Sequence, residues 1–334
     1  MENFLNFLKS PDQSLFYKRN EQGDIRFGEI VRTNPLEISN LMKQGLSEKS
    51  ISAVIIGFPY DEGTIRNHGR PGASSGPDSI REAFYKLTPI KSTDISAANV
   101  NLFDAGNLST EMKLEDALLE LEEIVMNFMK AGFIPIVLGG SNDLSYADFR
   151  ACKNIFNECG AINVDSHLDL REYPSGITSG SPYRMLIDRQ VLKGRNFVEY
   201  GIQEFANSPD HLLFAKEKGV SIVTLNELRI QKNSAAFKES YEKVNKNVNR
   251  VYVSFDIDSV RSSDAPGVSA GLPTGLYAEE ICECAYLAGL EERTAMIDIC
   301  EFNPRYDVDG RTAKLSALII ANFLAGISNR NNCR

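Results

Sequence analysis

Eight short apolar runs, rich in β-branched residues, alternate with longer amphipathic segments between residues 53 and 302. A run that is apolar throughout, and not only at every second residue, is typical of a strand covered on both faces. Crossover helices provide that cover when the strands are parallel. We therefore predict a single α/β domain with a three-layer α/β/α architecture and one doubly wound, eight-stranded parallel sheet. The expected strands are residues 53–58, 101–106, 134–140, 161–166, 197–202, 221–226, 251–258 and 295–302.

The segment that carries these runs continues without a linker, an internal repeat or a low-complexity stretch. We expect residues 51–330 to form one α/β catalytic domain, and residues 1–50 to form an N-terminal extension packed on it. Every apolar run is shorter than the roughly 20 residues that a membrane helix needs. The first residues also lack the basic start of a secretory signal, so we expect a cytoplasmic protein.

The acidic balance of the chain narrows the class of partner. The formal net charge is −9 at pH 7, and the sequence contains no basic run. Such a surface attracts neither nucleic acid nor an anionic membrane. The six cysteines have no CxxC spacing and no disulfide-like density, so we interpret them as reduced thiols. These observations leave a small molecule as the expected partner.

Acidic side chains gather where two of the expected strands end. Asp165, His167 and Asp169 follow one strand at alternate positions, and Asp256 and Asp258 close another. Ligands of doubly wound sheets bind beyond the carboxyl ends of the strands, and alternate positions send side chains to one side while the chain stays extended. Four carboxylates in one low-dielectric crevice repel each other unless cations lie among them. The pattern therefore predicts two divalent ions, and oxygen ligands with an imidazole favour Mn²⁺.

Each of these motifs has a simpler interpretation when it is taken alone. A single D-x-H-x-D or D-x-D can consist of caps and loop hydrogen bonds, and only the presence of both at strand ends favours a metal site. Other chemistries have less support. The sequence contains neither G-x-G-x-x-G nor G-x-x-x-x-G-K-[ST], and "GGSND" (139–143) is not the G-x-S-x-G of a serine nucleophile. A metal-dependent reaction is therefore the preferred interpretation.

A series of motifs, in order along the chain, carries a family resemblance. They are "GFPYDEGTIRNHGRPGASSGPDSIREAF" (57–84), "VDSHLDLR" (164–171), "SFDIDSV" (254–260), "APGVSAGLPTGL" (265–276) and "EFNP" (301–304). Together they make residues 50–325 resemble the arginase/agmatinase ureohydrolases. Within that family the chain is most similar to the formimidoylglutamases. The features behind this closer similarity are "NHGRPGASSGP", Arg171, "SGSPYR", "GIQEFANS" and "APGVSA".

The resemblance implies a three-layer α/β/α fold, a homo-oligomer and a binuclear manganese centre. It also implies hydrolysis of a C–N bond in a linear amidine, N-formimino-L-glutamate, to L-glutamate and formamide in histidine degradation. The attacking group in that reaction is a hydroxide that bridges both ions. By the same resemblance Asp165 and Asp256 bridge the ions, Asp169 binds one of them, and His167 and Asp258 bind the other. The two bridging aspartates are therefore candidate catalytic residues as well as ligands.

The resemblance also assigns the residues expected to hold the substrate. Glu301, a candidate catalytic residue at the end of the last strand, orients the cationic nitrogen group, unless it is only a helix or loop cap. Arg171 pairs with a substrate carboxylate through its guanidinium group, although a surface salt bridge is an alternative. Ser179, Gly180 and Ser181 offer hydroxyl and backbone donors, with a plain turn as the competing interpretation.

One ligand of the family pattern is missing. The family usually has a histidine two residues after the Gly-Gly pair, and this chain has Asn142 there. A neutral amide oxygen is a poorer ligand for a transition metal than an imidazole, so we expect a weakened first metal site. Asp143 is the nearest alternative ligand, but a shift of one residue on a tight loop usually points the side chain elsewhere. We interpret His68 as a solvated loop residue and His211 as structural.

Two functions of different classes follow from this pattern. The first is an active metal-dependent amidine hydrolase of the formimidoylglutamase type, or a hydrolase of another guanidino substrate. The second is a degenerate ureohydrolase fold with one metal ion or none, retained for binding or assembly. Retention of the four aspartates and Glu301 favours the first, and loss of the histidine favours the second.

Overall fold

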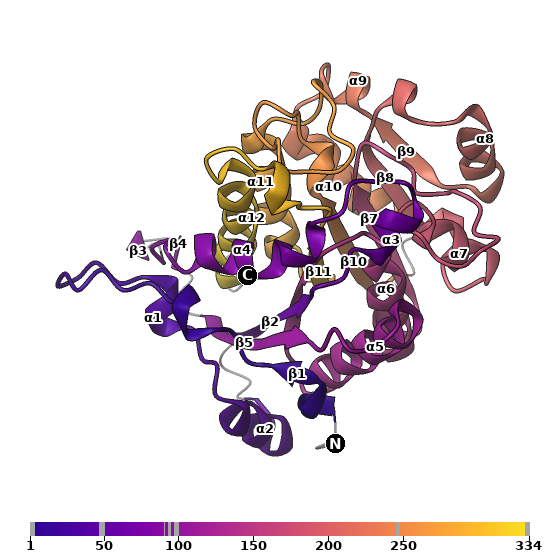
Figure 1. The fold of residues 1–334 in the computed structure, drawn as a ribbon. Helices are drawn as coiled ribbons and strands as arrows, with labels where there is room; N and C mark the ends of the chain where they lie inside the picture. The colour runs from indigo at the N-terminus through magenta and orange to yellow at the C-terminus, as the bar shows by residue number, and fades with distance from the viewer. Residues whose placement is uncertain are drawn as a thin grey trace.

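In the described part of the chain, one sheet of nine strands crosses the middle of the molecule, as Figure 1 shows. The computed structural model describes residues 4–46, 51–89, 91–92, 95–96, 100–244 and 248–330. The strands lie in the order β1-β5-β2-β6-β11-β10-β7-β8-β9, and all neighbours except β1 and β5 are parallel. The strands are β1 (Leu8–Lys9), β2 (Ile51–Phe58), β5 (Val100–Leu108), β6 (Ile134–Gly139), β7 (Cys159–Val164), β8 (Phe197–Ile202), β9 (Ser221–Thr224), β10 (Arg250–Asp256) and β11 (Thr294–Cys300). A separate short pair, β3 (Lys91–Ser92) and β4 (Ile95–Ser96), is antiparallel.

All eight predicted strands are present, and the predicted three-layer α/β/α architecture is confirmed. Their interiors are covered on both faces, and every residue of β7 and β11 is buried. Among the described residues the sheet has nine strands, which are the eight predicted parallel strands and the antiparallel edge strand β1, which was not predicted. Leu8 and Lys9 pair antiparallel with Leu108 and Asn107 at the edge of the sheet. A strand of two residues carries no periodic pattern that sequence analysis can detect.

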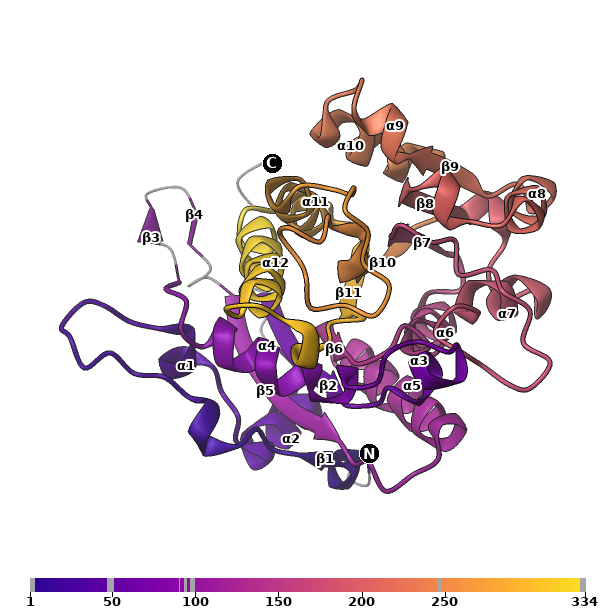
Figure 2. The same ribbon diagram turned by 45° about the horizontal axis from the view of Figure 1, so that its top comes forward.

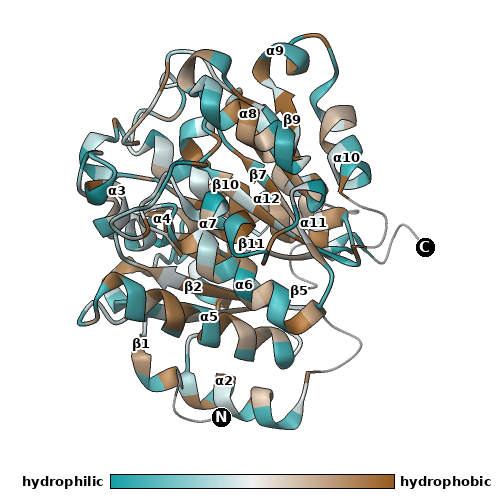
Figure 3. Cartoon of the chain, turned by 90° about the vertical axis from the view of Figure 1, so that its right-hand side faces the viewer, coloured by the Kyte–Doolittle hydropathy of each residue, from teal (hydrophilic) through white to brown (hydrophobic). Residues whose placement is uncertain are grey.

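Helices cover both faces of the sheet. Figure 2 shows α11 and α12 on one side of the strands and α5 and α6 on the other. Successive strand residues serve the two layers in turn, since Val253 of β10 packs in the core with α11 and α12, while Tyr252 packs in the core with α5 and α6. In Figure 3, α5 and α6 carry both hydrophobic and hydrophilic residues, as amphipathic covering helices do. The helices are α1 (Phe27–Ile30), α2 (Pro35–Gln44), α3 (Glu62–Arg66), α4 (Gly76–Phe84), α5 (Leu114–Lys130), α6 (Leu144–Phe156), α7 (Pro182–Asp188), α8 (Pro209–Lys218), α9 (Leu225–Leu228), α10 (Asn233–Lys243), α11 (Ala278–Leu290) and α12 (Arg311–Ser328).

The N-terminal residues 4–46 lie against the rest of the chain. They contain α1, α2 and the edge strand β1. The ring of Phe27 stacks on Phe84 with centroids 4.4 Å apart, and Ile38 is buried in the core. The division of the chain at residue 50 stays a prediction. Within the described residues, none of the helices has the length and apolar character that crossing a membrane requires.

The candidate site lies at the ends of four neighbouring strands. The strands β6, β11, β10 and β7 lie side by side and are parallel, so their carboxyl ends meet at the same edge of the sheet. The chain order reverses here, because β6 and β7 flank two strands that come later in the sequence. Doubly wound sheets bind their ligands at such a switch point.

Candidate metal centre and substrate pocket

The loop after β7 supplies three of the predicted metal ligands. The strand ends at Val164, and Asp165, His167 and Asp169 follow it outside regular structure. Asp169 has a φ of 48°, a left-handed conformation that stops the chain from continuing as an extended segment. The predicted convergence of the three side chains is therefore observed, but the extended alternation that we gave as its cause is wrong. A turned loop brings them together.

A tight turn after β10 supplies the other two predicted ligands. Asp256 is the last residue of the strand, and Asp258 lies in the 3-10 helix Ile257–Ser259. The backbone N–H of Asp258 donates to Asp256 Oδ1 at 2.9 Å. The loop after β7 contains the same local device, since the N–H of His167 donates to Asp165 Oδ1 at 2.7 Å. In both places an aspartate fixes the turn that follows it.

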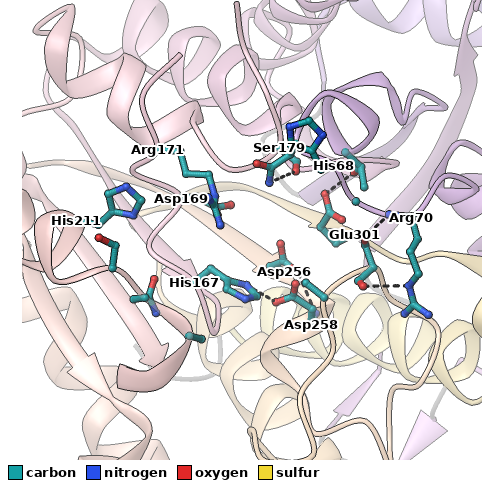
Figure 4. A pocket seen from close by; sticks show the side chains of 18 residues that line it. His68, Arg70, His167, Asp169, Arg171, Ser179, His211, Asp256, Asp258 and Glu301 are labelled. Atoms are coloured by element: carbon teal, nitrogen blue, oxygen red, sulfur yellow. Dashed lines mark hydrogen bonds and ion pairs between the residues drawn. The ribbon is translucent and has the colours of Figure 1, made fainter. Parts of the chain in front are cut away.

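These five side chains form two groups of potential metal ligands that share one aspartate. Ligand atoms of Asp165, His167 and Asp258 lie within 4.8 Å of one another, and so do those of Asp165, Asp169 and Asp256. In Figure 4, His167, Asp256 and Asp258 point toward one another inside the pocket. Of the two aspartates predicted to bridge, Asp165 belongs to both groups and Asp256 to one.

Burial and mutual repulsion keep protons on this cluster in the absence of a cation. Burial, and next the negative charge of Asp258, raise the pKa of Asp165 to about 6. The same two causes raise the pKa of Asp256 well above its usual range, and burial with the charge of Asp165 does so for Asp169. Divalent cations remove this repulsion, and carboxylate oxygens with an imidazole suit Mn²⁺. The residues present therefore fit a pair of such ions.

His167 faces two carboxylates with the same ring nitrogen. Its Nδ1 atom lies 3.4 Å from Asp165 Oδ1 and 3.3 Å from Asp258 Oδ1. The charge of Asp258 is the main reason that the pKa of His167 rises to about 12, while burial acts in the opposite direction. Within the part of the chain that the structure describes, the buried Oδ1 atom of Asp258 makes no hydrogen bond. A cation between an imidazole nitrogen and this carboxylate oxygen would satisfy both.

Asn142 presents its amide nitrogen to the cluster. Its Nδ2 atom donates to Asp169 Oδ2 at 2.6 Å, and its Oδ1 atom accepts from the hydroxyl of Ser145. The oxygen that would ligate a metal ion is therefore engaged elsewhere. Asp143, the alternative ligand, belongs to neither ligand group found in the described residues. Its Oδ1 atom accepts from the hydroxyl of Ser141, and burial raises its pKa to about 7.

Glu301 enters the site directly after β11. Its backbone has a φ of 62°, and its N–H donates to the carbonyl of Gly140 at 2.8 Å. The Oε1 atom accepts from Thr64 Oγ1 at 3.0 Å and from the N–H of Asn142 at 2.9 Å. Burial, and next the charge of Asp258, raise the pKa of Glu301 to about 8. A left-handed non-glycine backbone costs stability and is concentrated at functional sites, which fits the predicted role.

A pocket of about 320 Å³ lies over the cluster. Its volume is at the lower end of the range for small-molecule sites. Arg171, Ser179 and Glu301, which we predicted to bind the substrate, line it. Gly180 and Ser181 were predicted with them but are not among the lining residues. The side chain of Arg171 packs over Gly180, where an added Cβ would lie 2.7 Å from Arg171 Cδ, and the Ser181 hydroxyl bonds to the preceding turn.

Several polar residues of this pocket were not predicted from the sequence. His68 and His211 both line the pocket. We had interpreted His68 as a solvated loop residue and His211 as structural, and neither interpretation places the residue at the site. Asn67 also lines it and donates to Ser179 Oγ at 3.1 Å. These residues belong to segments that follow different strands, and only the tertiary structure brings them together. The motif "NHGRPGASSGP" contains Asn67 and His68, whereas "GIQEFANS" ends at Ser208, three residues before His211.

A model of the arginase family matches residues 51–326. This chain belongs to the arginase family. The formimidoylglutamase of Hahella chejuensis is 32% identical over 285 residues, which cover 82% of this chain and 84% of the relative. The crystal structure of Trypanosoma cruzi formiminoglutamase with Mn²⁺₂ has a TM-score of 0.83 and 33% identity, and the match covers 92% of this chain and 99% of that one. A variant of the T. cruzi enzyme with one asparagine replaced by histidine, also with Mn²⁺₂, has a TM-score of 0.80 and 34% identity over 88% of this chain and 98% of that one.

The family resemblance inferred from the motifs is thereby confirmed. The arginase family match begins at the first residue of β2 and ends within α12, so it contains all eight parallel strands. Both candidate ligand groups and the residues that line the pocket lie inside it.

Proposed function

We propose that this arginase family member is a manganese-dependent hydrolase that converts N-formimino-L-glutamate and water to L-glutamate and formamide. The observation that carries the proposal is the pair of ligand groups that share Asp165 beside a pocket lined by Arg171 and Glu301. The relatives support the same reaction. The Hahella chejuensis and Trypanosoma cruzi proteins are named formimidoylglutamase and formiminoglutamase, and the latter was solved with Mn²⁺₂.

The proposal includes two Mn²⁺ ions for each chain. Asp165, Asp169 and Asp256 would hold the first ion, and Asp165, His167 and Asp258 the second, with Asp256 as the second bridging carboxylate. When bound, such a pair supplies Lewis-acid activation of a water molecule near neutral pH. The chain itself keeps the ligands in place, because backbone N–H groups fix the carboxylates of Asp165 and Asp256.

The lining residues would orient the substrate by charge and by hydrogen bonds. Glu301, whose Oε1 atom is already fixed by two hydrogen bonds, would accept from the cationic nitrogen of the formimino group. Arg171 carries the planar donors that suit a substrate carboxylate. Ser179 Oγ accepts from Asn67, which leaves its own proton to donate. This arrangement selects a substrate with a planar cationic nitrogen group at one end and a carboxylate at the other.

A second candidate function is that of a degenerate family member with one ion or none and a role in binding or assembly. The specific observation that favours it is the orientation of Asn142, whose amide oxygen accepts from Ser145 and faces away from the ligands. The first candidate is preferred because the four aspartates and Glu301 stay together in one cluster despite their repulsion, with Asp169 partly exposed and the other four residues buried. Another guanidino substrate is the remaining alternative within the first class.

Substrate assays on metal-loaded protein test the proposal. Protein stripped with a chelator and reloaded with Mn²⁺ is assayed with N-formimino-L-glutamate, L-arginine and agmatine, and its metal content is measured by mass spectrometry. We expect formamide release from the first substrate and two ions per chain. Activity on agmatine alone would show that the substrate is a guanidino compound and not N-formimino-L-glutamate. If no substrate gives a product and the protein holds at most one ion per chain, the degenerate family member is favoured. Light scattering on the same sample tests the homo-oligomer that the family resemblance implies.

A further inference from the structure

The aspartate shared by both ligand groups is also held from inside the protein by a chain of buried polar residues. Asn163 Nδ2 donates to Asp165 Oδ2 at 3.3 Å and to Glu199 Oε2 at 3.0 Å. The hydroxyl of Tyr183 donates to Asn163 Oδ1 at 3.2 Å. All four residues are 0% exposed. The side chain of Asp165 therefore contacts a polar network that no part of the proposed reaction uses.

Three regular elements hold this network rigid. Asn163 lies on β7 and Glu199 lies directly opposite it on β8. Tyr183 lies on α7, and its ring stacks on Phe197 of β8 with centroids 4.6 Å apart. The amide of Asn163 has its oxygen occupied by one donor and its nitrogen occupied by two carboxyl groups. Its orientation is therefore fixed by partners on both neighbouring elements.

The network is unfavourable for stability, which points to a function. Burial, and next the charge of Asp165, raise the pKa of Glu199 well above its usual range. The Oε1 atom of Glu199 is buried, and none of the described residues forms a hydrogen bond with it. An apolar residue at this position of a strand covered on both faces would avoid both penalties. Such costs persist where the surrounding structure needs the group for another purpose.

We propose that Asn163, Glu199 and Tyr183 are positioning residues that hold Asp165 in the orientation in which it serves both ion positions. The inference rests on the metal centre of the proposed function. The N–H of His167 fixes one oxygen of Asp165 and Asn163 fixes the other, so the carboxylate is set from two directions. Glu199 and Tyr183 act one step further away, because they set the orientation of the Asn163 amide.

Four variants separate positioning from general stability. Tyr183→Phe removes the hydroxyl and keeps the ring that stacks on Phe197. Glu199→Leu removes the acceptor for Asn163, whereas Glu199→Gln keeps an acceptor oxygen in the same place. Tyr241→Phe is the matched control, because Tyr241 is also buried and its hydroxyl lies 2.7 Å from Thr294 Oγ1. Thr294 begins β11, so this contact lies at the end of the sheet away from the ligands.

Titration of chelator-treated protein with Mn²⁺, followed by the electron paramagnetic resonance of free Mn²⁺, measures affinity, and thermal unfolding in EDTA measures folding. We expect the Mn²⁺ dissociation constant to rise about 10-fold to 100-fold in Tyr183→Phe and Glu199→Leu. In Glu199→Gln and Tyr241→Phe the Mn²⁺ dissociation constant should stay within about threefold of the wild-type value, which is small beside the rise expected for the first two variants.

Two results would overturn this inference, and they differ in what they say of the proposed function. If Tyr183→Phe folds normally and binds Mn²⁺ as wild type does, the network is only structural and the proposed function is unaffected. If wild type binds no Mn²⁺, both proposals fail. Should Glu199→Leu not fold, the comparison of Tyr183→Phe with Tyr241→Phe still decides.

Discussion

The substitution Asp165→Asn separates the cost of the buried charges from their benefit to metal binding. Without metal, burial and the charge of Asp258 raise the pKa of Asp165 from 3.8 to about 6. The folded protein then holds this proton more tightly than the unfolded chain, so stability present near pH 4 is lost as the pH rises to about 6. At 1.36 kcal/mol for each pKa unit, the loss at pH 8 is about 3 kcal/mol.

Asparagine at this position has no charge to bury, but it offers one acceptor oxygen in place of two. Asp165 accepts hydrogen bonds from His167 and from Asn163, so the variant loses one of them, at about 1 kcal/mol. The expected net gain for the metal-free variant is about 2 kcal/mol at pH 8, or roughly 3 °C in melting temperature for a chain of this length. The gain should disappear toward pH 4.

Mn²⁺ should reverse this order of stability. Because Asp165 belongs to both ligand groups, Mn²⁺ should raise the melting temperature of wild type and leave that of the variant unchanged. Asp298→Asn is the matched control, since burial raises the pKa of Asp298 to about 6 as well, but this residue belongs to neither ligand group and the variant should keep its response to Mn²⁺. A variant Asp165→Asn that is less stable than wild type in EDTA at pH 8 would refute the electrostatic reasoning. One that Mn²⁺ stabilises as it does wild type would refute the shared-ligand role.

Four further results are expected. The variant Asp258→Ala should keep one of the two Mn²⁺ ions, measured as metal content per chain, because Asp258 belongs to only one of the two ligand groups. Loss of both ions would contradict this assignment. Arg171→Ala should raise the KM for N-formimino-L-glutamate at least about 10-fold with a smaller effect on kcat, as expected when uniform binding is lost, and equal losses with agmatine would exclude a carboxylate anchor. Asn142→His should tighten Mn²⁺ binding by at least about 10-fold in a metal titration, and an unchanged affinity would mean that another group completes the first site. Affinity for Mn²⁺ in wild type should rise as the pH passes about 6, because the ions displace the proton of Asp165, and an affinity independent of pH would show that no proton is released.

The fold could be predicted because its parallel strands are apolar on both faces. A buried strand such as β2, in which residues 53–58 are all buried and none has a polar side chain, leaves a continuous apolar run that a half-exposed strand does not show. The edge strand β1 could not be predicted, because the pairing of Leu8 with Leu108 depends on how the N-terminal residues return to the sheet. The hydrophobic pattern of a strand indicates which of its faces are buried, and β1, with two residues, is too short to show such a pattern.

The ligands of the metal centre could be predicted from chemistry, and their geometry could not. Carboxylates and a histidine that follow two strands indicate a cation site, whichever turns place them there. The alternate spacing suggested an extended chain, but Asp169 has a φ of 48°, which is a left-handed conformation. The departure at Asn142 was also visible in the sequence. Which of its amide atoms faces the cluster depends on Ser145 and Asp169, and these come from a helix and from another loop.

The positioning residues show where a sequence signal existed and why it was incomplete. Asn163 and Glu199 are polar residues inside runs that otherwise read as buried strands. A polar side chain in such a strand needs a partner, so each residue alone indicates a buried polar contact. The partner of Asn163 is set by the register between β7 and β8, in which it lies opposite Glu199. Sequence pattern predicts which residues need partners, whereas the order and register of the strands decide that these two meet behind Asp165.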